Sequence, residues 1–223
     1  MNSRRKFLFQ GSLAATALMV AKPYNALANY TSPLLQGGLN YNSITFLHTT
    51  GESLAVAAQV KRISNKTASI VLVHGDNNEQ QLNCDASLQS INENGDSGYK
   101  IIYKDNIRVG VISAAAGEQN MMSRVNHLSA YLKKEKDCSL VVCVSALGYK
   151  NKNGVDDLTL AAESENLDII VGKYAANSPK QPMIAKSKKK SEVIIQHTED
   201  SADALGKIKI GFDQQGRKYH ASF

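Results

Sequence analysis

Two runs of apolar, β-branched residues constrain the fold of this chain more than any other feature. The runs at 69–73 (SIVLV) and 139–144 (SLVVCV) are almost continuously apolar, which is typical of strands buried on both faces. Such strands need covering layers on both sides, so the two runs favour an α/β fold. A hydrophobic content of 43% in 223 residues supports one good core and excludes a disordered or fibrous chain.

Periodicity along the chain predicts the order of the remaining elements. We expect strands at 43–48, 69–73, 99–104, 107–112, 139–144, 167–171, 182–185, 193–196, 207–212 and 218–223, and helices at 54–63, 120–136 and 156–164. The polar stretch 77–98 predicts a loop with one short strand around Leu82. Asp105-Asn106 predicts a hairpin turn, and the alternation of strands and helices after it is typical of right-handed crossovers in a largely parallel sheet. The predicted fold is α/β, with two packed, mixed β-sheets flanked by helices.

The positive charge of the chain is concentrated at its N-terminus. Lys and Arg outnumber Asp and Glu by 26 to 20, which gives a net charge of +6. The first 28 residues hold four basic side chains and no acidic one, so the rest of the chain has 22 basic and 20 acidic residues, a net charge of +2. This distribution removes the main support for nucleic-acid binding, because the excess charge lies outside the predicted domain.

The N-terminal segment has the features of an export signal. Arg4 and Arg5, within SRRKFL, resemble the twin-arginine signal, and a weakly apolar run follows at 11–21. Ala26 and Ala28, within ALA, form a small-x-small cleavage site. The run is too short to span a bilayer, which takes about 20 apolar residues.

A basic amphipathic anchor is the alternative interpretation of this segment, but residues 9–22 show no polar helical face. We therefore expect a twin-arginine signal peptide at 1–28, a polar linker at 29–42 and one domain at 43–223. The protein would be exported to the periplasm and would have no membrane span after cleavage.

Three cysteines, Cys84, Cys138 and Cys143, are an odd number for an oxidising compartment, so at most one disulfide can form. Cys138 and Cys143 are five positions apart around a predicted strand, so we expect them on its opposite sides and unable to pair. We expect buried thiols that act as small apolar side chains. The sequence contains no Cys/His cluster with zinc spacing.

Several segments, taken in order, resemble one known family. They are ITFLHT (44–49), VHGD (73–76), the hairpin 99–113, CSLVVCVSALGY (138–149), LDIIVG (167–172), VIIQ (193–196) and LGKI (205–208). They are similar to the motifs ITILHTNDxH, DAGD, KDGIKIGVIG, CDLVICLSHLGY, DLIIGGHTH, VxVxQ and LGRI of the 5′-nucleotidase branch of the calcineurin-like metallophosphatases. The similarity runs, with gaps, over most of 43–213.

The resemblance implies a calcineurin-like metallophosphatase sandwich, trimmed in its metal-binding loops. Intact members hydrolyse phosphate esters with two divalent metal ions, which lower the pKa of a bound water and neutralise charge on the phosphoryl oxygens. Their ligands are carboxylate, imidazole and amide groups from five motifs on loops at strand ends.

Most of these ligand positions hold other residue types here. The motif ligands fall on Gly51, Ser53, Ala146, Tyr174 and Ala176. The GNHE motif has no counterpart in the stretch 77–98, which contains no histidine. Asp76 is the one ligand that matches, and a single carboxylate cannot hold two divalent cations in competition with water.

A mononuclear metal site could still be rebuilt around Asp76, with His74, Glu52 and Asp85 as the residues that could join it. We favour a simpler interpretation, in which His74 is a strand-end histidine bonded to the backbone and Asp76 caps the following turn.

Two further features resemble sites. Ser145 has no nucleophile elbow around it, and no histidine with an acidic partner can be assigned to it. The basic cluster Lys186–Lys190 (KSKKK) lies between two predicted strands without interleaved aromatic residues, so it predicts a solvated hairpin turn and no nucleic-acid site. Tyr174, at a ligand position, is expected to fill the cleft.

We therefore expect an exported, catalytically inactive metallophosphatase-like domain that binds no cofactor and acts as a binding or interaction module. Intact 5′-nucleotidases carry a C-terminal domain that holds the nucleoside, so a separate chain that supplies such a domain is a candidate partner. The alternative is a phosphoesterase with weak or altered metal use, in which Asp76 and His74 are the essential groups and hold a divalent metal.

The export interpretation predicts that the protein recovered from the periplasm begins near Asn29. Intact-mass measurement of that protein checks the prediction, because loss of 1–28 changes the mass by a known amount. A mass that still includes residues 1–28 would contradict cleavage after Ala28.

Overall fold

A computed structural model describes residues 42–50, 53–74, 84–87, 91, 98–150, 154–173, 178–199, 201 and 203–223. The expected signal peptide and all but the last residue of the expected linker lie outside the described residues. All described residues belong to the unit Tyr41–Phe223.

The described part of the chain forms three helices and eleven strands. They are β1 (Ser43–Thr49), α2 (Leu54–Ser64), β2 (Ser69–Val73), β3 (Ala86–Ser87), β4 (Tyr99–Lys104), β5 (Ile107–Ala114), α5 (Met121–Lys134), β6 (Leu140–Ser145), α6 (Asp157–Glu163), β7 (Ile169–Lys173), β8 (Met183–Lys186), β9 (Glu192–Thr198), β10 (Gly206–Phe212) and β11 (Lys218–Ser222). The expected elements are confirmed, with their ends moved by no more than two residues. The short strand expected around Leu82 is the exception: that residue lies outside the described ranges, and β3 follows it. None of the helices in these ranges is long and apolar enough to cross a membrane.

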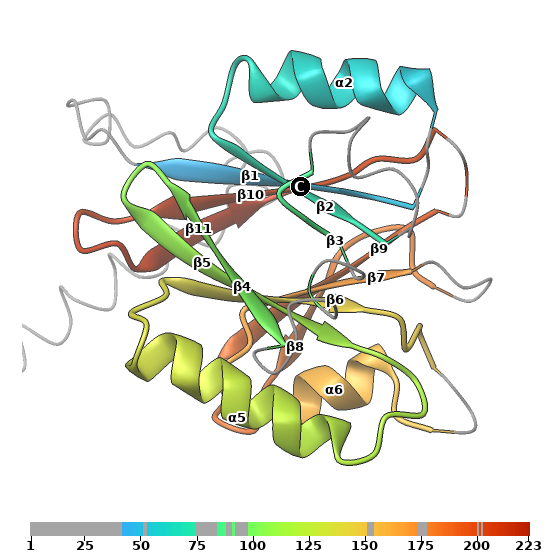
Figure 1. The fold of residues 1–223 in the computed structure, drawn as a ribbon, viewed down its shortest axis with the longest axis vertical. Coiled ribbons are helices and arrows are strands. Elements are labelled where there is room, and N and C mark those ends of the chain that lie inside the picture. Colours follow the sequence, from blue (N-terminus) through green and yellow to red (C-terminus); the bar gives the residue numbers. More distant parts are fainter. Residues whose placement is uncertain are drawn as a thin grey trace, which may run out of the picture. The chain divides into compact units, whose positions relative to one another are not determined.

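The strands form two mixed sheets. A five-stranded sheet has the order β11-β10-β1-β2-β3, with β1, β2 and β3 parallel. A six-stranded sheet has the order β4-β5-β6-β7-β9-β8, with β5, β6, β7 and β9 parallel. The two sheets lie between α2 on one side and α5 and α6 on the other (Figure 1). The predicted fold class, two packed mixed sheets with flanking helices, is confirmed.

Apolar side chains from facing strands hold the two sheets together. Ile44, Phe46 and Ile208 of the five-stranded sheet share one buried cluster with Val109 and Val142 of the six-stranded sheet. All five are 0% exposed, so bulk solvent does not reach these side chains. Burial on this scale contributes roughly 1.5–3 kcal/mol for each large side chain.

Alternation along β6 divides its residues between this layer and the helices. Val142 and Val144 face the other sheet, whereas Val141 and Cys143 pack in a second cluster with residues of α5 and α6. Both faces are covered, which is why the sequence of this strand is continuously apolar.

The cysteines differ from expectation in one respect. Cys138 and Cys143 lie in the same cluster, on the helix side of the six-stranded sheet, and not on opposite sides of a strand. The strand begins only at Leu140, so its alternation does not reach Cys138. Both are buried, as expected, and burial raises the pKa of each thiol. Cys138 and Cys143 are free thiols in the structure.

The turn at Asp105-Asn106 is confirmed as a tight hairpin. Both residues have positive φ, 46° and 67°, as a two-residue type I′ turn requires. Asp and Asn tolerate this conformation better than most residues, which explains why the pair predicted the turn.

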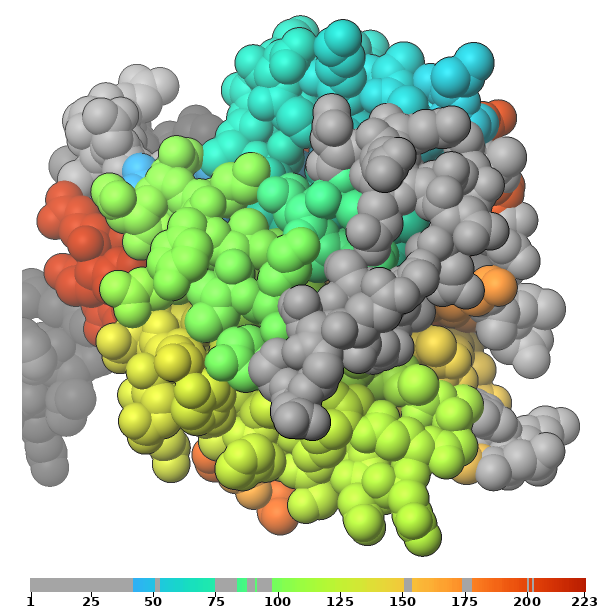
Figure 2. Space-filling model, in the orientation of Figure 1, coloured from blue at the N-terminus to red at the C-terminus, as the bar shows by residue number. Residues whose placement is uncertain are grey.

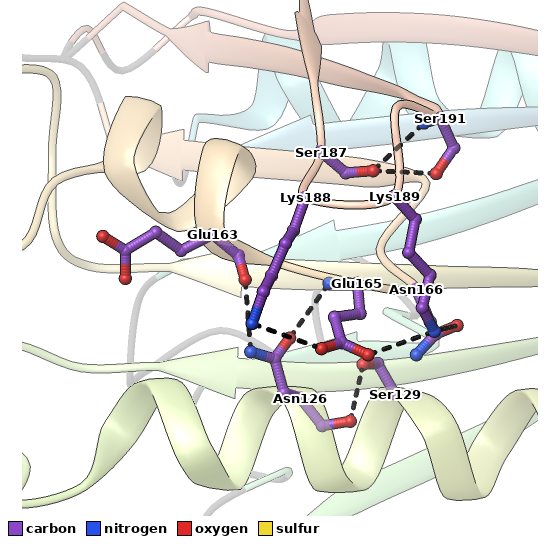
Figure 3. Close-up of polar contacts among 9 residues, drawn as sticks. All are labelled: Asn126, Ser129, Glu163, Glu165, Asn166, Ser187, Lys188, Lys189 and Ser191. Atoms are coloured by element: carbon purple, nitrogen blue, oxygen red, sulfur yellow. Dashed lines mark hydrogen bonds and ion pairs between the residues drawn. The ribbon is translucent and has the colours of Figure 1, made fainter.

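The basic cluster Lys186–Lys190 forms the turn between β8 and β9, as expected, but it is anchored to α6. The main-chain N–H of Lys188 donates to the carbonyl of Ser164 at 3.0 Å. The ammonium groups of Lys188 and Lys189 lie 3.6 and 3.1 Å from the carboxylate of Glu165, as Figure 3 shows. Part of the positive charge of this turn is therefore neutralised within the protein.

Asn126 of α5 also contacts the end of α6. Its side-chain amide donates to the carbonyl of Glu163 at 3.2 Å and accepts from the main-chain N–H of Glu165 at 3.0 Å (Figure 3). These bonds satisfy backbone groups at the end of α6. The neighbouring His127 is exposed.

Candidate functional site

Polar side chains gather where the parallel strands of both sheets end. His48 and Thr49 close β1, His74 follows β2, Ser145 closes β6 and His197 lies near the end of β9. The carboxyl ends of parallel strands lie at one edge of a sheet, which is the usual place for a ligand site in an α/β fold. All five of these side chains are buried.

The imidazole of His48 connects the two sheets. Its Nε2 lies 3.0 Å from Oε1 of Gln196, and its Nδ1 is hydrogen-bonded to the hydroxyl of Thr198; both partners belong to β9. Burial lowers the pKa of His48 to about 4, the Gln196 hydrogen bond opposes that change, and nearby His197 adds to it. The ring is therefore neutral at pH 7, and both of its nitrogens are occupied.

A second buried network joins α6 to β6 and β9. Oδ2 of Asp157 lies 2.8 Å from Nε2 of His197, and its Oδ1 accepts a hydrogen bond from the hydroxyl of Ser145. The same hydroxyl accepts from the main-chain N–H of Leu147 at 3.2 Å. Gly172 in β7 leaves room for the pair, because a Cβ there would lie 2.5 Å from Oδ2 of Asp157.

This network corrects the expectation that no histidine with an acidic partner stands near Ser145. The Asp157–His197 pair is formed by residues 40 positions apart, so no local motif announces it. The arrangement does not activate a nucleophile, since a carboxylate and not an imidazole accepts the serine proton. Ser145 is also 0% exposed, so substrate cannot reach its hydroxyl.

The ring of His74 has no hydrogen-bond partner among the described residues. Its main-chain N–H donates to the carbonyl of Thr49 at 3.1 Å, but neither ring nitrogen is paired with a described residue, and the residue is only 8% exposed. Burial lowers its pKa to about 3, and nearby His48, His197 and Lys173 add to that change. The expected bond to the backbone is thus made by the main chain alone. A buried ring without a partner is a position where a water or a ligand would be stabilised.

The ligand positions implied by the sequence resemblance are described only in part. Those outside the described residues are Gly51, Asp76, Tyr174 and Ala176, and Glu52, a candidate for the rebuilt site, also lies outside them. Whether Asp76 binds a metal therefore stays a prediction. Of the described positions, Ser53 is the N-cap of α2, where its Oγ accepts from the main-chain N–H of Val56 at 3.2 Å. Ala146 is exposed directly after β6.

Asp85 does not join His74. Its Oδ2 accepts from the main-chain N–H of Val71 at 2.8 Å, and its Oδ1 lies 3.3 Å from Nζ of Lys104. Asp85 also donates its main-chain N–H to the carbonyl of Val71. His74 lies three residues beyond Val71 along the chain, which is about 10 Å in an extended strand. The Asp85 carboxylate is therefore bonded to β2 and Lys104 and is not available at the strand ends.

Among the residues that the structure describes, no group of three or more His, Cys, Asp or Glu could hold a metal ion. The donor atoms explain this result. Both oxygens of Asp157 and both nitrogens of His48 already bond to protein groups. In contrast, neither ring nitrogen of His74 is hydrogen-bonded to a described residue.

Comparisons with known proteins identify the fold. No protein-family model and no curated protein matches the chain. Among solved structures, a 5′-nucleotidase precursor from Thermus thermophilus is similar at 14% identity and a TM-score of 0.60, over 81% of this chain and 53% of the other. An NAD nucleotidase from Haemophilus influenzae is similar at 13% identity and a TM-score of 0.59, over 82% of this chain and 49% of the other. A phosphatase from Mycoplasma pneumoniae is similar at 9% identity and a TM-score of 0.50, over 83% of this chain and 93% of the other.

These similarities define the class of fold. The domain shares its fold with these nucleotidase and phosphatase chains, as the sequence motifs predict. The chain spans about half the length of the two nucleotidases. At these identities the likeness concerns the fold, so function must be argued from the residues.

We predict that Gly206→Ala destabilises the protein by about 1–3 kcal/mol, because overpacking in a full core costs about that much. A Cβ at this position would collide with Nε2 of His48 and force apart the contact between the sheets. Urea unfolding measures the change. Gly211→Ala in the same strand is the matched control, since its Cβ would meet no atom closer than 3.9 Å. Equal effects of the two variants would contradict the role assigned to Gly206.

The buried histidines predict loss of stability in acid. The pKa of His48 is about 4 in the folded chain and near 6.5 when unfolded. Between these values the unfolded chain binds a proton that the folded chain does not, so stability is full above pH 6.5 and falls as the pH drops towards 4. The loss due to His48 is about 3 kcal/mol.

Urea unfolding at several pH values between 7.5 and 4 checks this prediction. His48→Gln should reduce the slope of stability against pH, whereas His127→Gln, at an exposed helix position, should leave it unchanged. An NMR titration that placed the pKa of His48 near 6.5 would contradict it.

Proposed function

We propose that this chain is an exported metallophosphatase-fold protein that binds a partner and does not hydrolyse phosphate esters. The strongest support is that the carboxylate and imidazole groups at the strand ends are hydrogen-bonded to other groups of the protein. The carboxylate of Asp157 and the imidazoles of His48 and His197 bond to protein groups. In an active site of this fold such groups would be directed at metal and substrate.

The residue types at the ligand positions support the same proposal. Ser53 is engaged in capping α2, and Ala146 offers no donor atom in its side chain. A site with two metal ions needs a bridging carboxylate and several further strong ligands. Asp76 alone would not supply them, and the proposal therefore includes no resident metal or other cofactor.

A phosphoesterase with altered metal use is the second candidate. It is favoured by one observation, the buried ring of His74 that no described residue pairs, which lies two positions before Asp76. An imidazole and a carboxylate at one strand end are a possible start for a mononuclear site.

The partner that we propose is a separate chain that supplies a nucleotidase-type C-terminal domain. The support is the resemblance of this chain's sequence motifs to the 5′-nucleotidase branch, whose intact members carry such a domain. We further propose delivery to the periplasm by the twin-arginine route, which rests on Arg4, Arg5 and the site at Ala26 and Ala28.

Metal content and phosphatase activity separate the two candidates. We predict that the full chain, refolded with Mn²⁺, Zn²⁺ or Fe²⁺, holds well under one metal per chain by mass spectrometry and turns over p-nitrophenyl phosphate no faster than buffer. The physical reason is that the described strand ends offer no set of three ligands.

Variants make this experiment decisive. Asp76→Ala and His74→Ala should leave metal content and the background rate as they are, like the exposed control His127→Ala. Stoichiometric metal together with turnover that Asp76→Ala abolishes and His127→Ala does not would refute the proposed function and establish the alternative.

A further inference from the structure

We propose that the open edge of β4, with the tyrosines and lysines around it, is the docking surface for an acidic, extended segment of a partner protein. The segment would add to the six-stranded sheet as a further antiparallel or parallel strand. This inference rests on the proposed function, because it names the surface and the chemistry through which such a module would bind.

One side of the β4 backbone pairs with no strand of the described residues. β4 is the first strand of the six-stranded sheet and pairs only with β5 among the described strands. In an antiparallel pair, alternate residues direct their N–H and C=O groups away from the partner strand. In Figure 2 the green atoms of β4 and β5 lie below the cyan atoms of α2.

Three tyrosines and two basic side chains lie on the β4–β5 hairpin or next to it. Tyr103 is 68% exposed and pairs across the hairpin with Arg108. The ring of Tyr99, on the same face of β4, lies 5.7 Å from that of Tyr131 in α5. Nζ of Lys136 lies 5.3 Å from the centre of the Tyr131 ring. Tyrosine and arginine are among the residues that contribute most energy to protein interfaces.

A groove of about 880 Å³ continues this surface at the Lys104 end of β4. It lies between that end and the last turns of α2, and its charged lining residues are Lys61, Lys66, Lys104, Asp85 and Asp105. Lys104 is paired with Asp85, but no ion pair joins Lys61 or Lys66 to a residue of the described ranges. The groove therefore offers two ammonium groups that no described carboxylate neutralises.

The charges favour a partner of opposite sign over a second copy of this chain. Lys100 and Lys104 lie on β4 itself, so two β4 edges paired with each other would bring like charges together. Lysines on an edge strand oppose such self-pairing. A strand that carries Asp or Glu would meet the same lysines favourably.

Two blocked ten-residue peptides serve as probes, one alternating Val and Glu and the other alternating Val and Lys. We expect the Glu peptide to bind the full chain in a fluorescence anisotropy titration, more weakly as salt is added, and the Lys peptide not to bind. Backbone amides of β4 should gain protection from hydrogen exchange when the Glu peptide is present.

Surface variants locate the site without affecting the core. Tyr103→Ala and the double variant Lys61→Glu/Lys66→Glu should each weaken binding of the Glu peptide about tenfold, a usual loss for an interface anchor. Tyr219→Ala is the matched control, because Tyr219 is a tyrosine of similar exposure, 63%, on the edge strand β11.

Three results would overturn this inference: equal binding of the two peptides, equal effects of Tyr103→Ala and Tyr219→Ala, or protection at β8 or β11 in place of β4. These outcomes are distinct from failure of the proposed function. A chain without phosphatase activity that ignored the Glu peptide would refute only the docking surface, whereas metal-dependent turnover would refute the proposed function whatever the peptides did.

Discussion

The contact between the two sheets is the constraint on which the rest of the structure depends. An apolar layer holds the sheets face to face, and at the carboxyl ends of the strands His48 continues the contact through Gln196 and Thr198. A buried imidazole is tolerated there because both of its nitrogens are hydrogen-bonded. The close approach also explains the absence of a side chain at Gly206, where a Cβ would collide with the ring.

The contact between the two sheets also bears on function, because polar side chains at the strand ends take part in it. A metallophosphatase directs carboxylates and imidazoles from the strand ends to metal ions, and those ions neutralise the charge of the ligands. Here the Asp157 carboxylate is stabilised by hydrogen bonds from within the protein, and His48 is kept neutral by burial. Polar residues at these positions therefore stabilise the fold. His74 differs because no described residue pairs its buried ring, which makes it the position where the second candidate function has its support.

Much of the fold could be predicted because local patterns and tertiary structure agree. The continuous apolar run at 69–73 became the fully buried β2, and the Asp105-Asn106 pair formed the expected turn. Cys138 is a residue for which local patterns are insufficient, because it precedes β6 and strand alternation does not determine the side on which it lies. The basic run Lys186–Lys190 was correctly placed in a turn, but its ion pairs with Glu165 come from another part of the chain, and charge patterns along a sequence do not reveal such partners.

The sequence by itself determined the layers of this protein, because the period and length of its apolar runs depend only on which faces of each strand and helix are buried. It also determined that Ser53 and Ala146, at two positions where the similar motifs carry metal ligands, have side chains that cannot supply a strong ligand. Only the tertiary structure decided the partners of the polar side chains. His48 with Thr198 and Asp157 with His197 are joined across 150 and 40 positions, and hydrogen bonds depend on distances of about 3 Å that only the packed chain defines.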